Sequence, residues 1–364
     1  MKSIFDKSAI KDLDLKNRLF KGAVWEELAR EDGHMTDELF EIYEELAKGG
    51  VGAIFTGYAY VCKEEQPNPR MMGIYDDSFI KEYKELTDMV HSHDSKIIMQ
   101  IVYGGTQSNM GYDDNIIFGP SAIRNEISGI MPKEMTKDDI EYLVNAYANA
   151  ALRVKKAGFD GVAMHGAHGY LLSQFLCPHY NQRSDEYGGS IENRMRIIVE
   201  IYENIREKVG KDYPVFMKIN SQDFFNGGLS EEESIKVIKV LEEKGLDCVE
   251  ISGGNESTKA VLKNNLGPAR KIKEQSQESY FKGFAKKLRT EVNIPIILTG
   301  GNRSTDLMEE LLNEDVVDYF GIARPFIYEP DLANKWAEDK NYKAKCKSCN
   351  GCYHTYGKRC VFDK

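Results

Sequence analysis

One pattern recurs along the chain: an amphipathic helix, a lysine and a glycine, then a short apolar run. Its clearest copies begin at Glu44, Arg153 and Leu241. Glycine directly after a lysine-rich last turn is a common helix C-cap. An apolar run without strict alternation is typical of a strand that is buried on both faces. The pattern therefore predicts repeated strand–helix units around a parallel sheet.

About eight apolar runs have the length of strands, which is the number that a closed barrel needs. Helical patterns lie between them, and no Gly-x-Gly-x-x-Gly turn joins a first strand to a helix, which disfavours an open doubly wound sheet. We therefore expect an α/β fold, a TIM (β/α)8 barrel. The predicted strands centre on residues 19–24, 51–56, 96–102, 161–165, 215–219, 248–251, 294–298 and 319–322. The clearest predicted helices span residues 138–157, 191–209 and 231–244.

Two longer irregular stretches interrupt the repeat, at residues 62–72 and 103–135. We expect loops over the barrel mouth there, which either shape substrate access or act as structural lids. The repeat fades near the end of the chain. We expect residues 1–340 to form the barrel and residues 341–364 to form a short cysteine-containing tail.

Composition narrows the class of protein. Of the 364 residues, 41% are hydrophobic and 29% charged, as in a globular enzyme, and the formal net charge is -10. That charge disfavours nucleic acid or an anionic membrane as the main partner. No basic-then-apolar signal peptide opens the chain and no apolar run approaches the length of a membrane span, so we expect a cytoplasmic location. The subunit number stays open, with a homo-oligomer as one option.

The strongest chemical signal follows the apolar run at residues 159–164, where the chain reads His165-Gly-Ala-His168-Gly-Tyr170. If that run is a strand, both imidazoles and the phenol lie at the C-terminal mouth of the barrel. Imidazoles there can hold a small anion or an enolate oxygen, and a phenol can deliver a proton, which indicates reduction of a polarised double bond. Two alternatives are histidines that pack or cap a helix, and a metal pair.

Polar residues also stand at the ends of other predicted strands. Gln100 ends the third strand and Lys218 the fifth. An amide suits a pyrimidine-like edge and a cation suits an oxygen that gains charge, although such residues are also common core polar groups. The loops after the seventh and eighth strands carry Gly300 with Gly301 and end on Arg324, which suits a phosphate or simply tight turns. Together these features indicate a phosphorylated flavin.

These motifs resemble the Old Yellow Enzyme family of FMN-dependent oxidoreductases, and the resemblance runs from about Ile4 to Trp336. The two-histidine motif and the segment that follows it, Asn181-x-Arg183-x-Asp185-x-Tyr-Gly-Gly-Ser-x-x-Asn-Arg, are highly specific to that family. The resemblance implies a TIM barrel with FMN at the C-terminal ends of its strands. It also implies that NADH or NADPH reduces the flavin transiently, and that the substrate is an α,β-unsaturated carbonyl compound.

The resemblance assigns roles to individual residues. His165 and His168 match the pair that binds the substrate carbonyl oxygen, and Tyr170 matches the catalytic proton donor. Three positions differ from the residues that are usual in the family. Trp25 stands where a small Thr or Cys is usual, and Tyr58 where a small residue is usual. Lys218 stands where an arginine is usual, so the positive charge is kept but the planar guanidinium fork is lost. The positions that match FMN-binding residues are Ala23, Val24, Trp25, Tyr58, Gln100, Lys218, Gly300, Gly301, Ala323 and Arg324.

Four of the seven cysteines are bunched at the end of the chain, at Cys346, Cys349, Cys352 and Cys360. In a reducing compartment such bunching suggests metal or cluster ligation before disulfides. The segment resembles the iron–sulfur segment of trimethylamine dehydrogenase and 2,4-dienoyl-CoA reductase, although its fourth cysteine comes early. A 4Fe–4S cluster, a structural zinc and a packed tail without metal all stay open.

The leading hypothesis is an ene-reductase that passes hydride from NAD(P)H through FMN to the C=C bond of an unsaturated carbonyl. One alternative is an oxidative demethylase or amine dehydrogenase that uses FMN, and another is a non-enzymatic flavin electron carrier. His165 and His168 favour an oxyanion-binding reductase over an amine site, which tends to be an aromatic box. Tyr170 beside both histidines disfavours a mere carrier.

Overall fold

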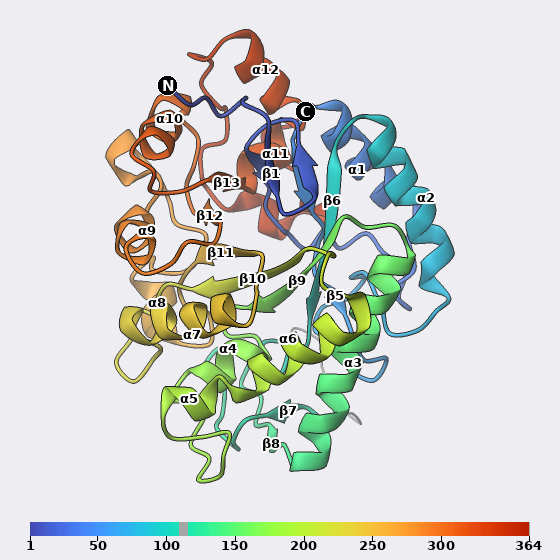
Figure 1. Cartoon of the computed structure of the whole chain (residues 1–364), viewed down its shortest axis with the longest axis vertical. Helices are drawn as coiled ribbons and strands as arrows, with labels where there is room; N and C mark the ends of the chain where they lie inside the picture. The colour runs from blue at the N-terminus through green and yellow to red at the C-terminus, as the bar shows by residue number, and fades with distance from the viewer. Residues whose placement is uncertain (109–115, 364) are drawn as a thin grey trace.

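The computed structural model describes residues 1–108 and 116–363. Its centre is a closed barrel of eight parallel strands with helices around it (Figure 1). The barrel strands are β3 (Leu19–Lys21), β4 (Ala53–Phe55), β6 (Lys96–Val102), β9 (Gly161–Gly166), β10 (Val215–Asn220), β11 (Cys248–Ser252), β12 (Ile296–Thr299) and β13 (Tyr319–Ile322). Because β13 pairs with β3, and β4 pairs with both β3 and β6, the ring closes. The predicted TIM barrel is confirmed, with strands at the predicted positions.

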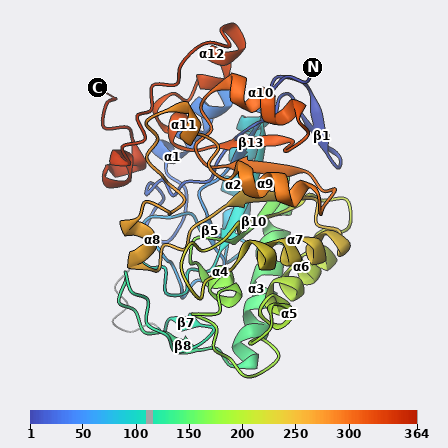
Figure 2. The ribbon, with the colours of Figure 1, turned by 90° about the vertical axis from the view of Figure 1, so that its left-hand side faces the viewer.

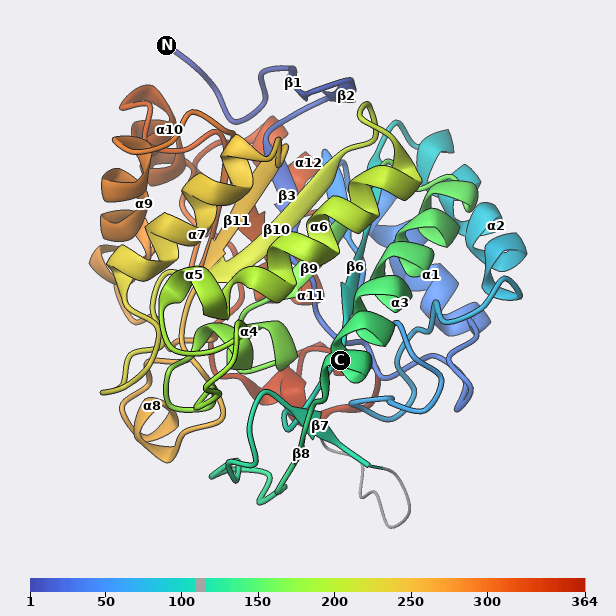
Figure 3. The same cartoon turned by 60° about the horizontal axis from the view of Figure 1, so that its bottom comes forward.

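Helices cover the outside of the barrel, and α3 and α6 pack against each other outside β6, β9 and β10 (Figure 3). Capping boxes start two of the predicted helices, Thr136 with Asp139 before α3 and Ser230 with Glu233 before α7. The helices are α1 (Asp37–Lys48), α2 (Phe79–Ser92), α3 (Lys137–Lys156), α4 (Leu171–Leu176), α5 (Ile191–Arg194), α6 (Arg196–Val209), α7 (Glu231–Glu243), α8 (Lys259–Lys263), α9 (Lys282–Arg289), α10 (Thr305–Asn313), α11 (Arg324–Tyr328) and α12 (Leu332–Glu338).

The predicted helix at residues 191–209 is two helices, α5 and α6, so that prediction was wrong in one detail. The break lies at Met195, where the amide of Ile198 donates to the carbonyl of Met195 three residues back. A three-residue hydrogen bond tightens the backbone at that turn. The apolar spacing on either side hides the break in the sequence.

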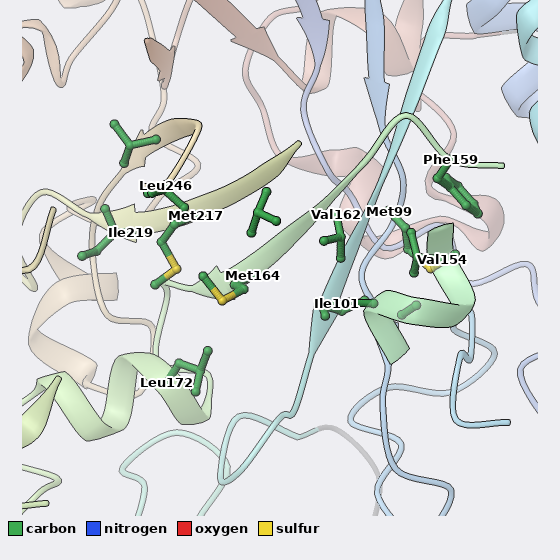
Figure 4. Packing of buried hydrophobic residues seen from close by; sticks show 14 of the residues in the cluster. Met99, Ile101, Val154, Phe159, Val162, Met164, Leu172, Met217, Ile219 and Leu246 are labelled. Atoms are coloured by element: carbon green, nitrogen blue, oxygen red, sulfur yellow. The ribbon is translucent and has the colours of Figure 1, made fainter. Parts of the chain in front are cut away.

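Alternation along the strands sorts side chains into an outer and an inner layer. On β9, Val162 and Met164 face the helices, with Met164 near Met217 of β10 and Val162 near Met99 of β6 (Figure 4). Ala163 belongs to the inner layer instead, together with Phe216. The next inward position on β9 is that of His165, so the strand itself aims this imidazole into the barrel at its C-terminal end.

The opposite end of the barrel is closed by an antiparallel hairpin of β1 (Ser8–Ile10) and β2 (Leu13–Leu15). Its Ile10, Leu13 and Leu15 pack with the inner layer of the barrel. The hairpin therefore covers the inner layer at the N-terminal ends of the strands. A binding site can open only at their C-terminal ends.

The two predicted loops lie at the mouth, since Asn68 of one and Gln107 of the other line the cavity described below. Part of the second loop, residues 109–115, lies outside the described residues. The short strand β5 (Ala59–Tyr60) precedes the first loop, and β7 (Phe118–Gly119) and β8 (Lys133–Glu134) lie in the second.

After α12 the chain continues as the cysteine-containing tail, which is seen in red at the left of Figure 2. Its only regular structure within the described residues is two short 3-10 turns, η2 (Gly351–His354) and η3 (Tyr356–Lys358); a third, η1 (Gln275–Gln277), lies earlier in the chain. Arg303 fastens the tail to the barrel by donating to the carbonyl of Cys346 at 2.9 Å. Among the described residues, no helix has the length and apolar character needed to cross a membrane.

Candidate active site

A cavity of about 350 Å³ opens at the C-terminal ends of the barrel strands. The structure brings together in it every residue that the sequence pointed to for substrate, proton transfer and flavin, although these come from seven separate segments of the chain. Those residues are Ala23, Val24, Trp25, Tyr58, Gln100, His165, His168, Tyr170, Lys218, Gly300, Gly301, Ala323 and Arg324.

The two histidines lie side by side with their ring planes 89° apart and their centroids at 5.2 Å. The amide of Ala167 donates to Nδ1 of His165 at 3.3 Å, which leaves the hydrogen of a neutral imidazole on Nε2. His168 has its Nε2 at 2.7 Å from Oγ of Ser252. Its backbone φ of 63° lies in the left-handed region, which Asn220 supports by accepting from the His168 amide. Such a conformation costs about 1–3 kcal/mol, and it is typical of a functional site.

Both imidazoles are neutral at physiological pH. Burial holds the pKa of His165 and of His168 well below the usual value, and the nearby Lys218 cation lowers both further. A neutral imidazole still has one N–H to donate. The pair can therefore stabilise negative charge on a substrate oxygen without first taking up a proton.

Tyr170 stands beside them at the N-cap of α4. Its ring centroid is 4.7 Å from that of His165, and the side chain is only 8% exposed. Burial raises the pKa of its phenol above the usual value, so the hydroxyl keeps its proton at physiological pH. The site thus places a proton donor next to two hydrogen-bond donors.

Gln100 on β6 gives the clearest sign of a missing partner. Its side chain is fully buried, and among the described residues neither Oε1 nor Nε2 has a hydrogen-bond partner. Leaving both ends of a buried amide unpaired is costly, and native structures rarely do so. A bound heteroaromatic edge with one donor and one acceptor would satisfy this amide.

Lys218 lies in the same cavity and is held by Glu250 on the next strand, with Nζ 2.9 Å from Oε1. Both side chains are buried, and β10–β11 pairing puts them in register. Thr299 donates to the same Glu250 oxygen at 2.7 Å. The ion pair fixes the position of the ammonium group, which partly replaces the planar fork that an arginine would supply.

The loop after β12 is tied to both neighbouring strands. Asn302 in this loop donates to the carbonyl of Leu298 on β12 at 2.6 Å and to that of Gly321 on β13 at 3.0 Å. Gly300 and Gly301 have φ values of 134° and 84°, and a Cβ on either would lie 2.7 Å from the Tyr280 ring. Glycine is therefore required for the turn itself.

Arg324 begins α11 beside these glycines, and its guanidinium has two partners. It donates to Oδ1 of Asn350 in the tail at 2.6 Å and to the carbonyl of Arg270 at 2.9 Å. Both partners are neutral, so the charge of Arg324 is not neutralised by them. With the unpaired Gln100 amide at the other end of the cavity, these residues fit a phosphorylated flavin such as FMN.

Replacing Arg324 with alanine should weaken FMN binding roughly ten- to a hundredfold, because one charge-assisted phosphate contact is lost. An FMN titration followed by flavin fluorescence gives the dissociation constant. Asn350→Ala is the control, since it removes the tail contact of the guanidinium and keeps the guanidinium itself. Equal losses in both variants would show that Arg324 acts through the tail and not on the phosphate.

Several residues of the cavity wall were missed by reasoning from the sequence. Ser252 ends β11 and Asn68 lies in the first long loop; both line the cavity. Ser252 could have been found, because it stands at the C-terminal end of a predicted strand. Tyr353 and Lys358 could not, since they come from the tail, which has no barrel pattern.

Lys358 closes one side of the cavity. Its Nζ lies 4.2 Å from the centroid of the Trp25 ring, and it also pairs with Glu27 and donates to the carbonyl of Tyr353 at 3.2 Å. A cation over a tryptophan face is a favourable contact. The tail is therefore part of the cavity wall.

The family-specific segment after Tyr170 is structural. Arg183 is buried, pairs with Asp185, and donates to the carbonyls of Pro120 and Met135 at 3.0 and 2.7 Å. Asn181 donates to the carbonyl of Phe175 at the end of α4. These bonds fasten the second long loop and α4, which carries Tyr170, to the same turn.

The four tail cysteines do not form a metal site as they lie here. Among the described residues, no group of three or more His, Cys, Asp or Glu side chains is arranged to hold a metal. Cys349 is exposed and Cys352 is buried, and all seven cysteines are free thiols. The four thiols thus do not fit a cluster or a zinc ion in this arrangement.

Comparison with known proteins identifies the family of the chain. The sequence model of the NADH:flavin oxidoreductase / NADH oxidase family matches residues 3–343. A protein named NADH oxidase from Thermoanaerobacter brockii is 35% identical over 354 residues, with 96% of this chain and 53% of that protein covered. One named cinnamate reductase from Clostridium sporogenes is 31% identical, with 96% and 55% covered.

Among solved structures, a complex of 2-naphthoyl-CoA reductase with 2-naphthoyl-CoA matches with a TM-score of 0.89 and 26% identity, covering 98% of this chain and 56% of that one. The chain thus spans about half the length of these relatives. The matched residues include the whole barrel and every residue of the predicted flavin and substrate site. The resemblance to Old Yellow Enzymes is confirmed, and the chain belongs to the NADH:flavin oxidoreductase / NADH oxidase family.

Proposed function

We propose that the chain is an FMN-dependent ene-reductase that uses NADH or NADPH to reduce the activated C=C bond of an α,β-unsaturated carbonyl compound. The observation that carries the proposal is the grouping of His165, His168 and Tyr170 in the cavity that fits a flavin. FMN bound there would supply the hydride-transfer chemistry between NAD(P)H and the β carbon of the alkene.

The histidines orient and polarise the substrate. The Nε2–H of His165 and the ring of His168 hydrogen-bond the carbonyl oxygen, which gains negative charge as hydride arrives at the β carbon. Fixed donors aimed at a developing oxyanion stabilise it strongly in a buried site. Neutral imidazoles suit this role because their donors are present throughout the physiological pH range.

Tyr170 completes the reaction on the other carbon. Its phenol breaks its O–H bond and gives the proton to the α carbon of the enolate, and solvent then reprotonates the tyrosine. The raised pKa of Tyr170 keeps the phenol protonated until the enolate, a stronger base than a simple carbonyl, is present.

The names of two relatives support this substrate class. One relative is named cinnamate reductase and one solved structure is of 2-naphthoyl-CoA reductase, and both cinnamate and 2-naphthoyl-CoA carry a carbonyl group conjugated with carbon–carbon double bonds. Oxidation of a cationic amine is less well supported. Two neutral imidazoles that each keep an N–H donor suit a substrate oxygen better than a positively charged substrate.

The pH dependence should reflect Glu256, which lines the cavity and whose pKa is raised to about 7 by burial. Below that pH the carboxyl is neutral, and above it a carboxylate opposes charge on the substrate oxygen. The rate of enone reduction should therefore fall as pH rises through about 7. Stopped-flow reoxidation across this range measures it. Glu256→Gln should stay at the acid-side rate, and an unchanged transition in that variant would refute the assignment.

An anaerobic experiment tests the function. FMN-loaded protein is reduced with NADH or NADPH and then mixed with cyclohexenone or oxygen, and oxidised FMN-loaded protein is mixed separately with trimethylamine. The proposal expects rapid reoxidation by cyclohexenone with formation of cyclohexanone. Flavin that is reduced directly by trimethylamine would establish the amine dehydrogenase instead, and reoxidation by oxygen alone would favour an oxidase or carrier.

The four tail thiols do not fit a metal as they are arranged, and metal analysis tests that arrangement against the 4Fe–4S cluster and the zinc ion that the sequence left open. Iron, acid-labile sulfide and zinc analysis of anaerobically purified protein separates them. About four iron atoms per chain with an equal amount of acid-labile sulfide would indicate a 4Fe–4S cluster. One zinc ion per chain would indicate a structural zinc site. Substituting Cys346, Cys349, Cys352 and Cys360 one at a time then identifies the ligands.

A further inference from the structure

The hydroxyl that the proposed function uses as proton donor is held by a second phenol. Oη of Tyr170 donates to Oη of Tyr58 at 2.8 Å, with the ring centroids 5.2 Å apart. Nδ2 of Asn68 donates to the same Tyr58 oxygen at 3.1 Å. The three side chains line the active-site cavity and come from three different segments of the chain. The two tyrosines are 112 residues apart in the sequence.

The hydrogen bonds leave Tyr58 with a hydrogen that can be redirected. A hydroxyl has one hydrogen and two acceptor lone pairs. Tyr170 and Asn68 occupy the lone pairs of Tyr58, which fixes the position of the Tyr170 phenol while it keeps its proton. Once Tyr170 has lost that proton, the O–H of Tyr58 can turn and donate to the phenolate oxygen. An O–H···O⁻ bond is roughly twice as strong as a neutral one.

Such a bond matters because Tyr170 is buried. Its neighbours include Met71 and Val102, and an unpaired phenolate among them would be costly. Burial raises the pKa of Tyr170, and the hydrogen bonds of Tyr58 and Asn68 lower it. The second phenol therefore opposes the main obstacle to proton release.

We propose that Tyr58 is a positioning residue for proton transfer: it orients Tyr170 in the resting site and donates to the phenolate after the α carbon has been protonated, while Asn68 holds Tyr58. This inference rests on the proposed function. In the step, the Tyr170 O–H bond breaks and a C–H bond forms with the electron pair of the enolate. NAD(P)H supplies the hydride through FMN, and water returns the proton to Tyr170.

The test compares two matched variants of the FMN-loaded chain. Tyr58→Phe removes the proposed hydroxyl and keeps the ring. Tyr60→Phe makes the same change two residues along the chain, where the hydroxyl donates to the carbonyl of Asp32 at 2.9 Å. Reduced protein is reoxidised with cyclohexenone, and separately with a quinone, which needs no protonation at carbon.

Tyr58→Phe should lower the limiting rate with cyclohexenone roughly tenfold, the scale of one charge-assisted hydrogen bond. The half-saturating concentration and the quinone rate should stay unchanged, and the solvent deuterium isotope effect should rise. Tyr60→Phe should resemble the unmodified protein in all four measurements. An equal loss with quinone would overturn the inference, because Tyr58 would then act on the flavin or the fold.

A double-mutant cycle gives the sharpest result. If Tyr58 acts only through Tyr170, Tyr58→Phe should cause no further loss in the Tyr170→Phe background, whereas independent roles would add. A crystal structure of the Tyr58→Phe variant should also show the Tyr170 hydroxyl displaced. If cyclohexenone reduction were slow in Tyr170→Phe but normal in Tyr58→Phe, this inference alone would be overturned. A normal Tyr170→Phe would overturn the acid assignment of the proposed function, and this inference with it.

Discussion

Tyr170→Phe should slow the reduction of cyclohexenone about 10²- to 10⁴-fold, the usual scale for removal of a general acid. The ring remains, so its packing beside His165 and the fold should be kept. FMN content and flavin reduction by NAD(P)H should be close to normal. Stopped-flow measurement of the two half-reactions separates these effects.

Quinone or oxygen provides the internal control for Tyr170→Phe. Neither acceptor needs a proton on carbon, so their rates should stay near those of the unmodified protein. Unchanged enone turnover would mean that solvent or another group is the acid. A parallel loss with all acceptors would point to a disturbed flavin site.

His168→Ala should lower the rate of enone reduction about 10²- to 10³-fold, as for the loss of one oxyanion donor. The variant also releases the Ser252 hydroxyl, which lies 2.7 Å from Nε2, so its effect includes that partner. Ser252→Ala measures this second part by itself. Flavin reduction by NAD(P)H should change much less than enone reduction.

His179→Ala is a matched control for the histidine prediction. Its ring makes edge-to-face contacts with Tyr180 and Phe225, and these contacts do not involve His165 or His168. It should keep near-normal enone turnover. If His168→Ala instead lost FMN in proportion to activity, the histidine would be structural and the oxyanion role would be wrong.

The barrel could be predicted because each strand is a short, doubly buried apolar run between amphipathic helices. The inward-facing site residues followed from that assignment, since His165, Gln100 and Lys218 lie at or near the ends of such runs. Strand ends in a parallel barrel meet at one mouth. Sequence positions far apart were therefore expected in one place, and the structure brings them into one cavity.

Contacts between loops could not be predicted in this way. The hydrogen bond between Tyr58 and Tyr170 depends on the paths of two segments outside the strands, as does the placement of Lys358 over Trp25. Hydrophobic periodicity carries no information about such paths. The resemblance marked Tyr58 as unusual and assigned it to the flavin, but its hydroxyl faces Tyr170.

The segment at residues 181–194 shows the opposite limit. Its motif is highly specific, as that of a catalytic segment would be. Arg183 nevertheless donates its hydrogen bonds to Asp185 and to two backbone carbonyls. A buried arginine that satisfies loop carbonyls can be as restrictive in sequence as a catalytic group. Motif specificity by itself does not separate positioning from chemistry.

A flavin-binding titration tests whether the cavity is an FMN site. We expect the protein to bind one FMN per chain, FAD no better than FMN, and riboflavin more weakly because it lacks the phosphate that Arg324 and the Gly300 loop would hold. Protein that is colourless as purified and gives no change in flavin absorbance or fluorescence with FMN would show that the cavity is not an FMN site.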